Sequence, residues 1–288
     1  MKIVSLLPAA TEIVWGLGLG EALVGRSHEC DFPAEVAALP VLTRARVDSS
    51  LPSDALDREV KRILHEGLPL YELDEERLHA LAPDVVVTQA ACEVCAISYD
   101  QVQRVARRAA PGARVLSLQP ARWTDILTDV RTVALACGVR AEGERRVREL
   151  EVRLAALARP NGTPKPRVAM IEWLDPPMLG AQWVPDIVEA AGGEPVGPPH
   201  GTLSPYVTWE KVADLQPDAV VVAPCGFDLA RTLREAEPHR DRLQDLAPRV
   251  LFMDGNAYWN RPGPRLVEAA ESLSGWLSTG SIPSGCAG

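Results

Sequence analysis

The sequence predicts an α/β protein with two Rossmann-like lobes, each holding a mostly parallel sheet, joined by a long helical connector and with a ligand cleft between the lobes. Three observations predict this fold class. The chain has 288 residues, which is more than one hydrophobic core usually serves. Short β-branched runs alternate with helical segments, which is typical of parallel sheets covered by helices on both faces. The same order of elements also occurs twice along the chain.

The repeat is clearest in two matching stretches. One is "LHALAPDVVVTQAAC", which starts at Leu78, and the other is "VADLQPDAVVVAPC", which starts at Val212. Each contains a helix end, a Pro-Asp turn, a β-branched strand and then a cysteine. Because proline and aspartate favour turns while β-branched residues favour strands, we expect each stretch to lead from a helix into a buried strand.

The first lobe is expected to span residues 1–120. Its opening segment, "KIVSLLPAAT", predicts a strand, a turn and a helix that is capped at or near Thr11. The glycines of "GLGLG" follow that helix, so we expect them to end it. A loop that cradles the phosphates of a dinucleotide would need them between strand and helix. The lobe finishes with a short strand and a polar loop, "ARVLSLQP".

Residues 121–160 are expected to form the connector. Apolar residues recur there at spacings of three and four, helix-forming residues are dense, and no proline occurs before Pro160. We expect Gly138 and Gly143 to mark a break between two helices.

The second lobe is expected to span residues 161–288 and to repeat the first. "PRVAMIEWL" and "PRVLFMDGN" predict strands that end in loops, and glycine-rich turns separate them from helices. The final residues, "SIPSGCAG", are expected to be a disordered tail.

The composition narrows the range of partners. The net charge is −9, and lysine and arginine are scattered among acidic residues, so nucleic acid is not an expected partner. No apolar run approaches the roughly 18–20 residues of a membrane span. The first 20 residues resemble a signal peptide in having one lysine before apolar residues, but Glu12 interrupts that run and no small-x-small cleavage site follows. We therefore expect a cytoplasmic protein.

The loops that follow the strands carry the candidate ligand-binding residues. In parallel sheets, ligands bind outside the carboxyl ends of the strands, and clefts between lobes favour small molecules. Aromatic side chains gather in the loops of the second lobe, where they offer flat apolar contact area; packing in the core is the alternative for part of them. The predicted ligand-binding residues are Ser5, Pro8, Thr11, Gln89, Glu172, Trp173, Trp183, Tyr206, Asn256, Tyr258 and Trp259.

The chain resembles the substrate-binding proteins of cobalamin and iron-siderophore import, whose lobes are joined by one rigid helix. The matching features are "SLLPAATEIVWGLGLGEALVG", "ALAPDVVVTQ" and "DGNAYWNRPGPRLVEAAESL", and the first is closest to the cobalamin-binding branch. The resemblance covers nearly the whole chain. It implies a cobalamin-like corrinoid, or a related metal chelate, held across the cleft without chemistry. Exported members dock on a membrane permease through surface glutamates, a role that we carry over to no residue of this apparently cytosolic member.

The cysteines suggest a second reading. In a reducing compartment six cysteines do not indicate a disulfide framework; Cys137 is expected in the core and Cys286 in the tail. Thiolates select zinc, copper(I) or iron–sulfur clusters. The open alternatives are inert packing, a redox pair in "CEVC", and a thiolate or His28 bound directly to the cobalt of a corrinoid. The predicted metal-binding residues are His28, Cys30, Cys92, Cys95 and Cys225.

Two functions from different classes therefore remain. The leading hypothesis is a protein that binds a corrinoid, and the alternative is a zinc or iron–sulfur protein with a redox or enzymatic role. Acidic residues such as Asp175 and Asp254 follow predicted strands, and an enzyme acting through Cys95 or Glu172 is a third possibility. No complete catalytic set supports it, so a binding protein is favoured over an enzyme, and the sequence leaves that choice open.

Overall fold

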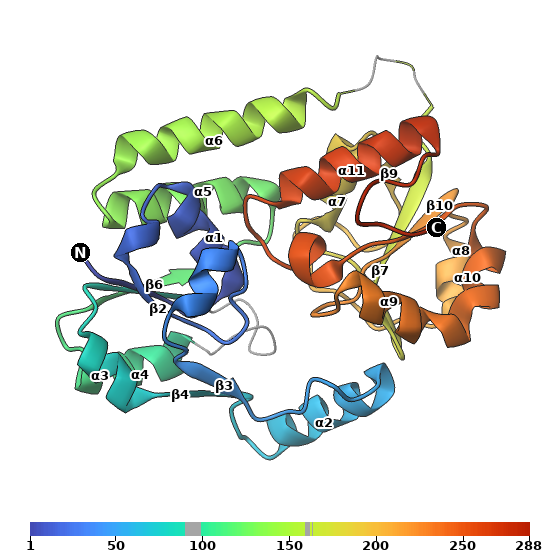
Figure 1. Ribbon diagram of the computed structural model, residues 1–288. Helices are drawn as coiled ribbons and strands as arrows, with labels where there is room; N and C mark the ends of the chain where they lie inside the picture. Colours follow the sequence, from blue (N-terminus) through green and yellow to red (C-terminus); the bar gives the residue numbers. More distant parts are fainter. Residues whose placement is uncertain (90–98, 159–161, 163) are drawn as a thin grey trace. The chain divides into compact units, whose positions relative to one another are not determined.

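The computed structural model of the protein describes residues 1–89, 99–158, 162 and 164–288 (Figure 1). The chain forms two compact units. Unit 1 contains Met1–Leu51, Ala55–Pro120 and Thr124–Arg148, and unit 2 contains Pro52–Asp54, Ala121–Trp123 and Glu149–Gly288. Each unit has its own mainly parallel sheet and its own apolar core. The predicted fold class, two α/β lobes with mostly parallel sheets, is confirmed.

Unit 1 has a four-stranded parallel sheet in the order β2-β1-β5-β6. Its strands are fully or partly buried because β-branched and leucine side chains face helices on both sides. The strands are β1 (Ile3–Ser5), β2 (Leu23–Arg26), β5 (Val85–Gln89) and β6 (Arg114–Leu118), and the helices of this part are α1 (Pro8–Gly16), α3 (Glu75–Leu81) and α4 (Tyr99–Ala109), with short 3₁₀ turns at Gly20–Ala22 and Ala34–Ala38.

Helix α1 begins earlier than predicted. Pro8 occupies its first turn, where the missing N–H of proline costs nothing. Thr11 is not the cap: its hydroxyl donates to the Leu7 carbonyl inside the first turn. The prediction of a cap at Thr11 was therefore wrong by about one turn.

A small antiparallel pair extends unit 1. β3 (Thr43–Ala45) pairs with β4 (Tyr71–Leu73), and α2 (Ser53–His65) lies between them in the sequence. The two strands were not anticipated, because strands of three residues carry too little periodicity to be recognised.

Unit 2 has a sheet in the order β11-β10-β7-β8, with β9 also paired to β7. All pairs are parallel except that of β7 with β8. The strands are β7 (Arg167–Leu174), β8 (Pro177–Leu179), β9 (Glu194–Pro195), β10 (Ala219–Val222) and β11 (Val250–Phe252), and the helices are α7 (Val184–Ala190), α8 (Trp209–Asp214), α9 (Leu229–Ala236), α10 (Arg240–Leu246) and α11 (Leu266–Thr279), with a 3₁₀ turn at Glu237–His239 and a π-helical turn at Gly255–Trp259.

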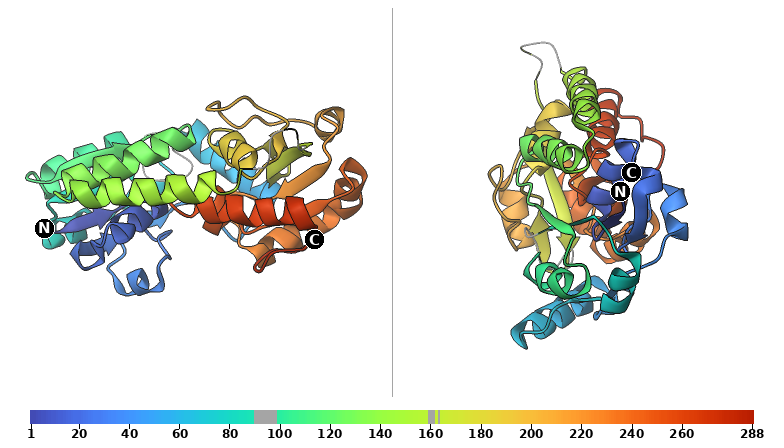
Figure 2. Two further views of the ribbon diagram at one scale, coloured as in Figure 1. Left: turned by 90° about the horizontal axis from the view of Figure 1, so that it is seen from above. Right: turned by 90° about the vertical axis from the view of Figure 1, so that its left-hand side faces the viewer.

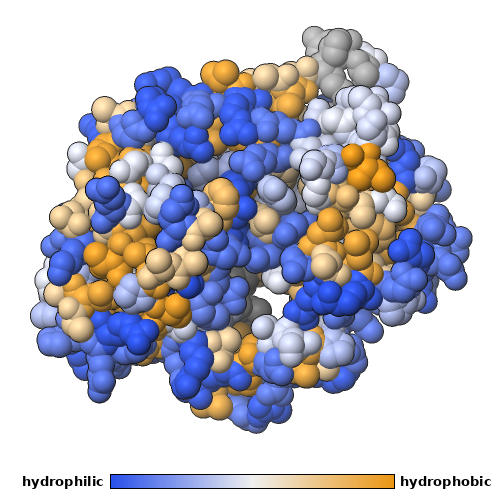
Figure 3. Space-filling view, viewed as in Figure 1, coloured by the Kyte–Doolittle hydropathy of each residue, from blue (hydrophilic) through white to orange (hydrophobic). Residues whose placement is uncertain are grey.

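The predicted connector contains two helices, α5 (Trp123–Ala136) and α6 (Arg140–Ala155), which run side by side in Figure 2. Gly138 adopts φ +75° and separates them, as expected. Gly143 lies inside α6 instead of at the break: a Cβ there would come within 2.4 Å of the Ala134 side chain, so this glycine lets the two helices pack closely. The outward surface of α6 is strongly hydrophilic (Figure 3).

The C-terminal tail is ordered, which corrects the prediction of a disordered segment. The Phe252 N–H donates to the Ala287 carbonyl at 2.8 Å, and the Ala287 N–H donates to the Phe252 carbonyl at 3.0 Å. These bonds satisfy backbone groups on the open edge of β11. In the part of the chain that the structure describes, every helix is too short or too polar to cross a bilayer.

Candidate functional site

At the carboxyl edge of the unit 1 sheet, three predicted residues come together in the interior. The Thr11 hydroxyl lies 2.8 Å from Ser5 Oγ and 3.0 Å from Cys30 Sγ. All three side chains are at most 1% exposed. They join β1, α1 and the loop after β2. Both hydroxyls therefore serve an internal network, and a direct contact of Ser5 and Thr11 with a ligand stays a prediction.

Cys30 and His28 are two residues apart in the sequence but have different partners. His28 Nδ1 lies 2.7 Å from Thr43 Oγ1, and its Nε2 lies 3.1 Å from Glu29 Oε1. Cys30 and His28 belong to no cluster of three metal-binding side chains among the described residues. Cys225 belongs to unit 2. Cys92 and Cys95 lie outside the described residues.

Two more predicted residues of unit 1 lie at the same edge. Gln89 ends β5 and is 6% exposed, and Pro8 opens α1 and is half-buried. Glu12, which interrupts the apolar run of the first 20 residues, lies within α1 and is buried.

At the carboxyl edge of the unit 2 sheet, two aromatic rings and an arginine side chain are in contact. The Trp173 and Phe227 ring centroids are 5.1 Å apart, and the two ring planes are inclined at 51°. The Arg231 guanidinium lies 3.7 Å from the centroid of the Phe227 ring. Phe227 is 1% exposed, whereas Trp173 is only partly buried. A buried ring thus supports an accessible one, an arrangement that suits contact with a flat ligand.

A β-bulge sets the position of Trp173. The register of β7 against β8 shifts between Ile171 and Trp173, so Glu172 is the extra residue. Its carbonyl accepts from the Cys225 N–H at 2.9 Å. Bulges redirect side chains and are frequent beside binding sites.

The loop after β11 supplies the other predicted residues. Asp254 caps the π-helical turn, its side chain accepting from the Ala257 N–H at 2.6 Å. Burial raises the pKa of this carboxyl, partly offset by that hydrogen bond. The turn presents Asn256 and Tyr258, both half-buried. Burial also raises the pKa of Tyr258, over which the Arg265 guanidinium lies at 5.7 Å from the ring centroid.

Two predicted aromatic residues are core residues instead. Trp259 is 0% exposed and Trp183 is 8% exposed. The Trp183 indole donates to the Trp259 carbonyl at 2.8 Å, and the Trp259 indole donates to Met253 Sδ at 3.1 Å. Both side chains are thus buried in the structure, and their assignment to the ligand surface stays a prediction. Tyr206 is 49% exposed and pairs with Met178 beside β8, so its role stays a prediction.

Sequence reasoning missed Phe227, Arg231 and Arg261. Arg261 is 5% exposed and donates to Asn256 Oδ1 at 3.0 Å. Phe227 could have been found because it directly follows "APCG" at the end of a predicted strand. Trp173 has a similar place at the end of another predicted strand. Nothing local marks either arginine as part of the site, since both lie on polar, charged stretches.

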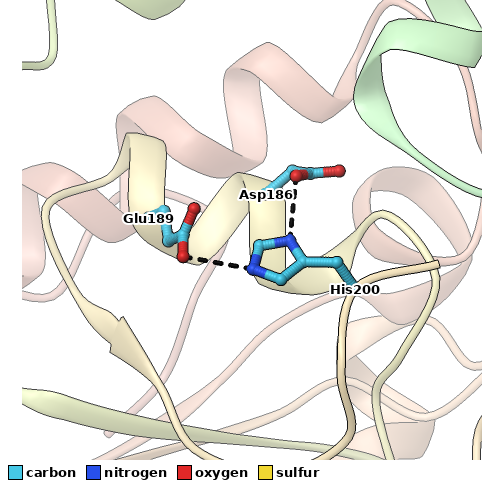
Figure 4. Close-up of side chains that lie close together, drawn as sticks. All are labelled: Asp186, Glu189 and His200. Atoms are coloured by element: carbon cyan, nitrogen blue, oxygen red, sulfur yellow. Dashed lines mark hydrogen bonds and ion pairs between the residues drawn. The ribbon is translucent and has the colours of Figure 1, made fainter. Parts of the chain in front are cut away.

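A separate charged cluster lies on α7 and the following loop (Figure 4). His200 Nδ1 lies 3.0 Å from Asp186 Oδ1, and its Nε2 lies 3.1 Å from Glu189 Oε1. The Asp186 carboxylate also accepts hydrogen bonds from Arg122 Nε at 2.8 Å and from Arg122 Nη2 at 2.6 Å. These three acidic and histidine side chains are close enough to suggest a metal site.

The geometry favours an ion-pair network over a metal. The two carboxylates face opposite ring nitrogens, so each oxygen occupies the place that a metal would take on that nitrogen. The charge of Asp186 is already balanced by Arg122. Burial acts to raise the pKa of Asp186. Hydrogen bonds from Arg122, the Trp123 N–H and His200 outweigh this effect, so the pKa of Asp186 lies below its usual value.

The comparisons with known proteins agree with this architecture. Residues 3–245 match the family model described as periplasmic binding protein. The vitamin B12-binding protein of Vibrio parahaemolyticus serotype O3:K6 is 23% identical over 272 residues, covering 93% of this chain and 86% of that protein.

Two solved structures are similar over nearly their whole length. One is the periplasmic heme-binding protein RhuT from Roseiflexus sp. RS-1, with a TM-score of 0.68, 23% identity and coverage of 96% of this chain and 97% of that one. The other is the periplasmic vitamin B12 binding protein BtuF of Vibrio cholerae, with a TM-score of 0.64, 17% identity and 96% of each chain covered. The family resemblance seen in the sequence is thus confirmed at this level, and the chain belongs to the periplasmic binding protein family.

Proposed function

We propose that this protein is a substrate-binding protein whose ligand is a cobalt corrinoid of the cobalamin type. The observation that carries the proposal is the match, over 93% of this chain, to a protein named for vitamin B12 binding. The proposal is also supported by the unit 2 face, the surface at the carboxyl edge of the unit 2 sheet that includes Trp173, Asn256 and Tyr258. A corrinoid is broad and flat with polar amides at its rim, and that face combines aromatic rings with polar and charged groups.

Trp173 is expected to supply the largest apolar contact. Its ring packs against buried Phe227, whose ring also contacts the Arg231 guanidinium, so little rotamer freedom is left to lose on binding. Tyr258 and Asn256 on the neighbouring loop would contact the rim of the ligand. These residues bind and orient the ligand, and the role requires no bond to be made or broken.

Heme is the second candidate, because a heme-binding protein is among the similar structures. Both ligands are flat tetrapyrrole-type metal chelates, and an aromatic surface suits either. The rims differ: heme carries carboxylates, whereas cobalamin carries neutral amides.

A direct titration separates the two ligands. Purified protein is titrated with cyanocobalamin and, separately, with hemin, and binding is followed by calorimetry and by the absorption spectrum. We expect cobalamin to bind with a Kd of about 1 µM or lower, which corresponds to roughly −8 kcal/mol, and hemin to bind at least about tenfold more weakly. Tighter binding of hemin would replace the first candidate by the second, and binding of neither would reject the proposal.

Substitution of Trp173 tests the surface itself. Trp173→Ala is expected to weaken cobalamin binding by roughly 10- to 100-fold, the range for losing a buried aromatic contact. Trp15→Ala is the matched control, because Trp15 is also partly buried but lies near the C-terminal end of α1, at the opposite edge of its sheet. Equal losses from both variants would argue against a ligand surface at Trp173.

The predictions of a metal site on the cysteines and of a cytoplasmic location have less support. A zinc or iron–sulfur site on the cysteines finds no counterpart in the names of the related proteins. The cytoplasmic location stays a prediction, which cell fractionation with an antibody to this protein would test.

A further inference from the structure

The loop after β10 and the loop after β11 are fastened together by one side chain, Asn260. Its Nδ2 donates to the Ala223 carbonyl at 3.0 Å and to the Gly255 carbonyl at 3.1 Å. Its backbone N–H donates to the Gly255 carbonyl as well, closing the π-helical turn. A single amide group therefore bridges the loop after β10 and the loop after β11.

The backbones of these loops are in direct contact. A Cβ on Gly255 would lie 2.1 Å from the Pro224 carbonyl oxygen and 2.6 Å from that of Ala223, so only glycine permits this approach. The Asn256 N–H donates to the Phe227 carbonyl at 3.0 Å. Beyond the last sheet pair of β10 and β11, these bonds replace the ladder that the strands no longer provide.

The contacts reach the ligand-facing groups on both sides. Through Phe227 the bridge is continuous with the Trp173 ring, and through the π-helical turn it is continuous with Asn256 and Tyr258. We propose that Asn260 is a positioning residue that fixes the spacing between Trp173 and Tyr258, so that the ligand-facing surface of unit 2 is formed before ligand arrives. This inference rests on the proposed function of that face.

The chemistry of the bridge makes a sharp test possible. Both partners of Nδ2 are carbonyl oxygens, so position 260 must donate. Asn260→Asp keeps the shape but at neutral pH presents an oxygen to two acceptors. If Asn260 only filled space, this variant would behave like the wild type; if it acts as a donor, it should be more harmful than Asn260→Ala.

The first readout needs no ligand. Hydrogen exchange is measured on residues 223–228 and 253–260 of the free protein. Both variants should exchange faster than the wild type in both segments. The matched control is Asp218→Ala, which removes a similar tie at the amino edge of the same sheet, where Asp218 Oδ2 accepts from the Arg167 N–H at 2.7 Å. It should leave both segments unchanged.

The second readout is cobalamin affinity. We expect Asn260→Ala to weaken binding about tenfold, since two hydrogen bonds are lost, and Asn260→Asp to weaken it further at pH 7. Relative to the wild type, Asn260→Asp should recover as the pH falls toward about 4, where a protonated carboxyl can donate again. When Asn260→Ala is combined with Trp173→Ala, the fold-loss of cobalamin affinity should be smaller than the product of the two single fold-losses, because both substitutions act through one surface.

The outcomes separate the two proposals. If Asn260→Asp exchanges and binds like the wild type, or if its effect multiplies fully with that of Trp173→Ala, the positioning role is overturned. If the wild type binds neither cobalamin nor hemin, the proposed function fails, and the exchange comparison alone then decides whether Asn260 holds the two loops together.

Discussion

Asp129 shows how one buried carboxyl makes stability depend on pH. It lies on α5 and is 9% exposed, and its Oδ2 has no hydrogen-bond partner within the described residues. Burial, with a smaller contribution from the nearby charge of Asp125, raises its pKa to about 7. The folded protein therefore holds a proton there more tightly than the unfolded chain does, which favours folding at acidic pH.

Asp129→Asn should remove this dependence. The stabilisation from the proton is complete below about pH 4, the usual value for an unfolded aspartate, and is lost as the pH rises through about 7. At pH 8 the variant should have a free energy of unfolding about 1–3 kcal/mol above that of the wild type, and at pH 5 the gain should be much smaller. Urea unfolding at both pH values measures it. An equal difference at the two pH values would contradict this prediction.

Asp186 behaves in the opposite sense. Its lowered pKa means that the ionised form stabilises the fold, and that this stabilisation is present above the unfolded value and lost as the pH falls through the folded one. Asp186→Asn should lower the free energy of unfolding at pH 7 by about 2 kcal/mol, because hydrogen bonds to a charged group are lost. The gap to the wild type should narrow below about pH 4. Denaturant unfolding at pH 7 and pH 3.5 checks both statements.

At the scale of elements, the start signals of several helices behave as sequence rules expect. Asp74, Thr208 and Asp228 each precede a helix and accept a hydrogen bond from the N–H three residues on. These bonds are local, so the sequence can specify them. The C-terminal tail is different: "SIPSGCAG" has the composition of a loop, and its order comes from a strand edge about 35 residues away along the chain.

Ala287→Pro tests the tail. Proline removes the N–H that donates to the Phe252 carbonyl, so the amide of Phe252 should exchange faster and the free energy of unfolding should fall by about 1 kcal/mol. Ala287→Ser keeps the N–H and is the control. Equal exchange of the Phe252 amide in the two variants would show that the tail does not protect β11.

At the scale of the whole molecule, ligand binding and stability are linked. A ligand that binds only the folded protein stabilises it by about 2.7 kcal/mol at one hundred times its Kd. For a chain of this size we expect cobalamin at that excess to raise the Tm by about 5 °C or more, measured by differential scanning calorimetry. Trp173→Ala at the same ligand concentration should show a smaller rise, whereas Trp15→Ala should not differ from the wild type in this increment. An unchanged Tm in the wild type would contradict binding to the folded state.

The sequence by itself determined the α/β class, the two lobes and the two helices in residues 121–160. These follow from alternation of strand and helix patterns and from the repeated Pro-Asp turn before each β-branched strand, which are signals carried by neighbouring residues. It also placed Asn256 and Tyr258 in the loop after a strand, because that loop follows directly from the strand, whereas Trp173, expected in such a loop, lies within β7.

Only the tertiary structure decided which aromatic rings face inward. Trp183 precedes α7 and Trp173 lies near the end of β7, yet the first is held by the Trp259 carbonyl inside the core and the second remains partly accessible. The same holds for Cys30, enclosed by Thr11, and for Asn260, whose carbonyl partner Ala223 is 37 residues away. Burial and hydrogen bonding at these positions depend on residues distant in sequence, and local periodicity contains no information about which distant backbone will lie beside a given side chain.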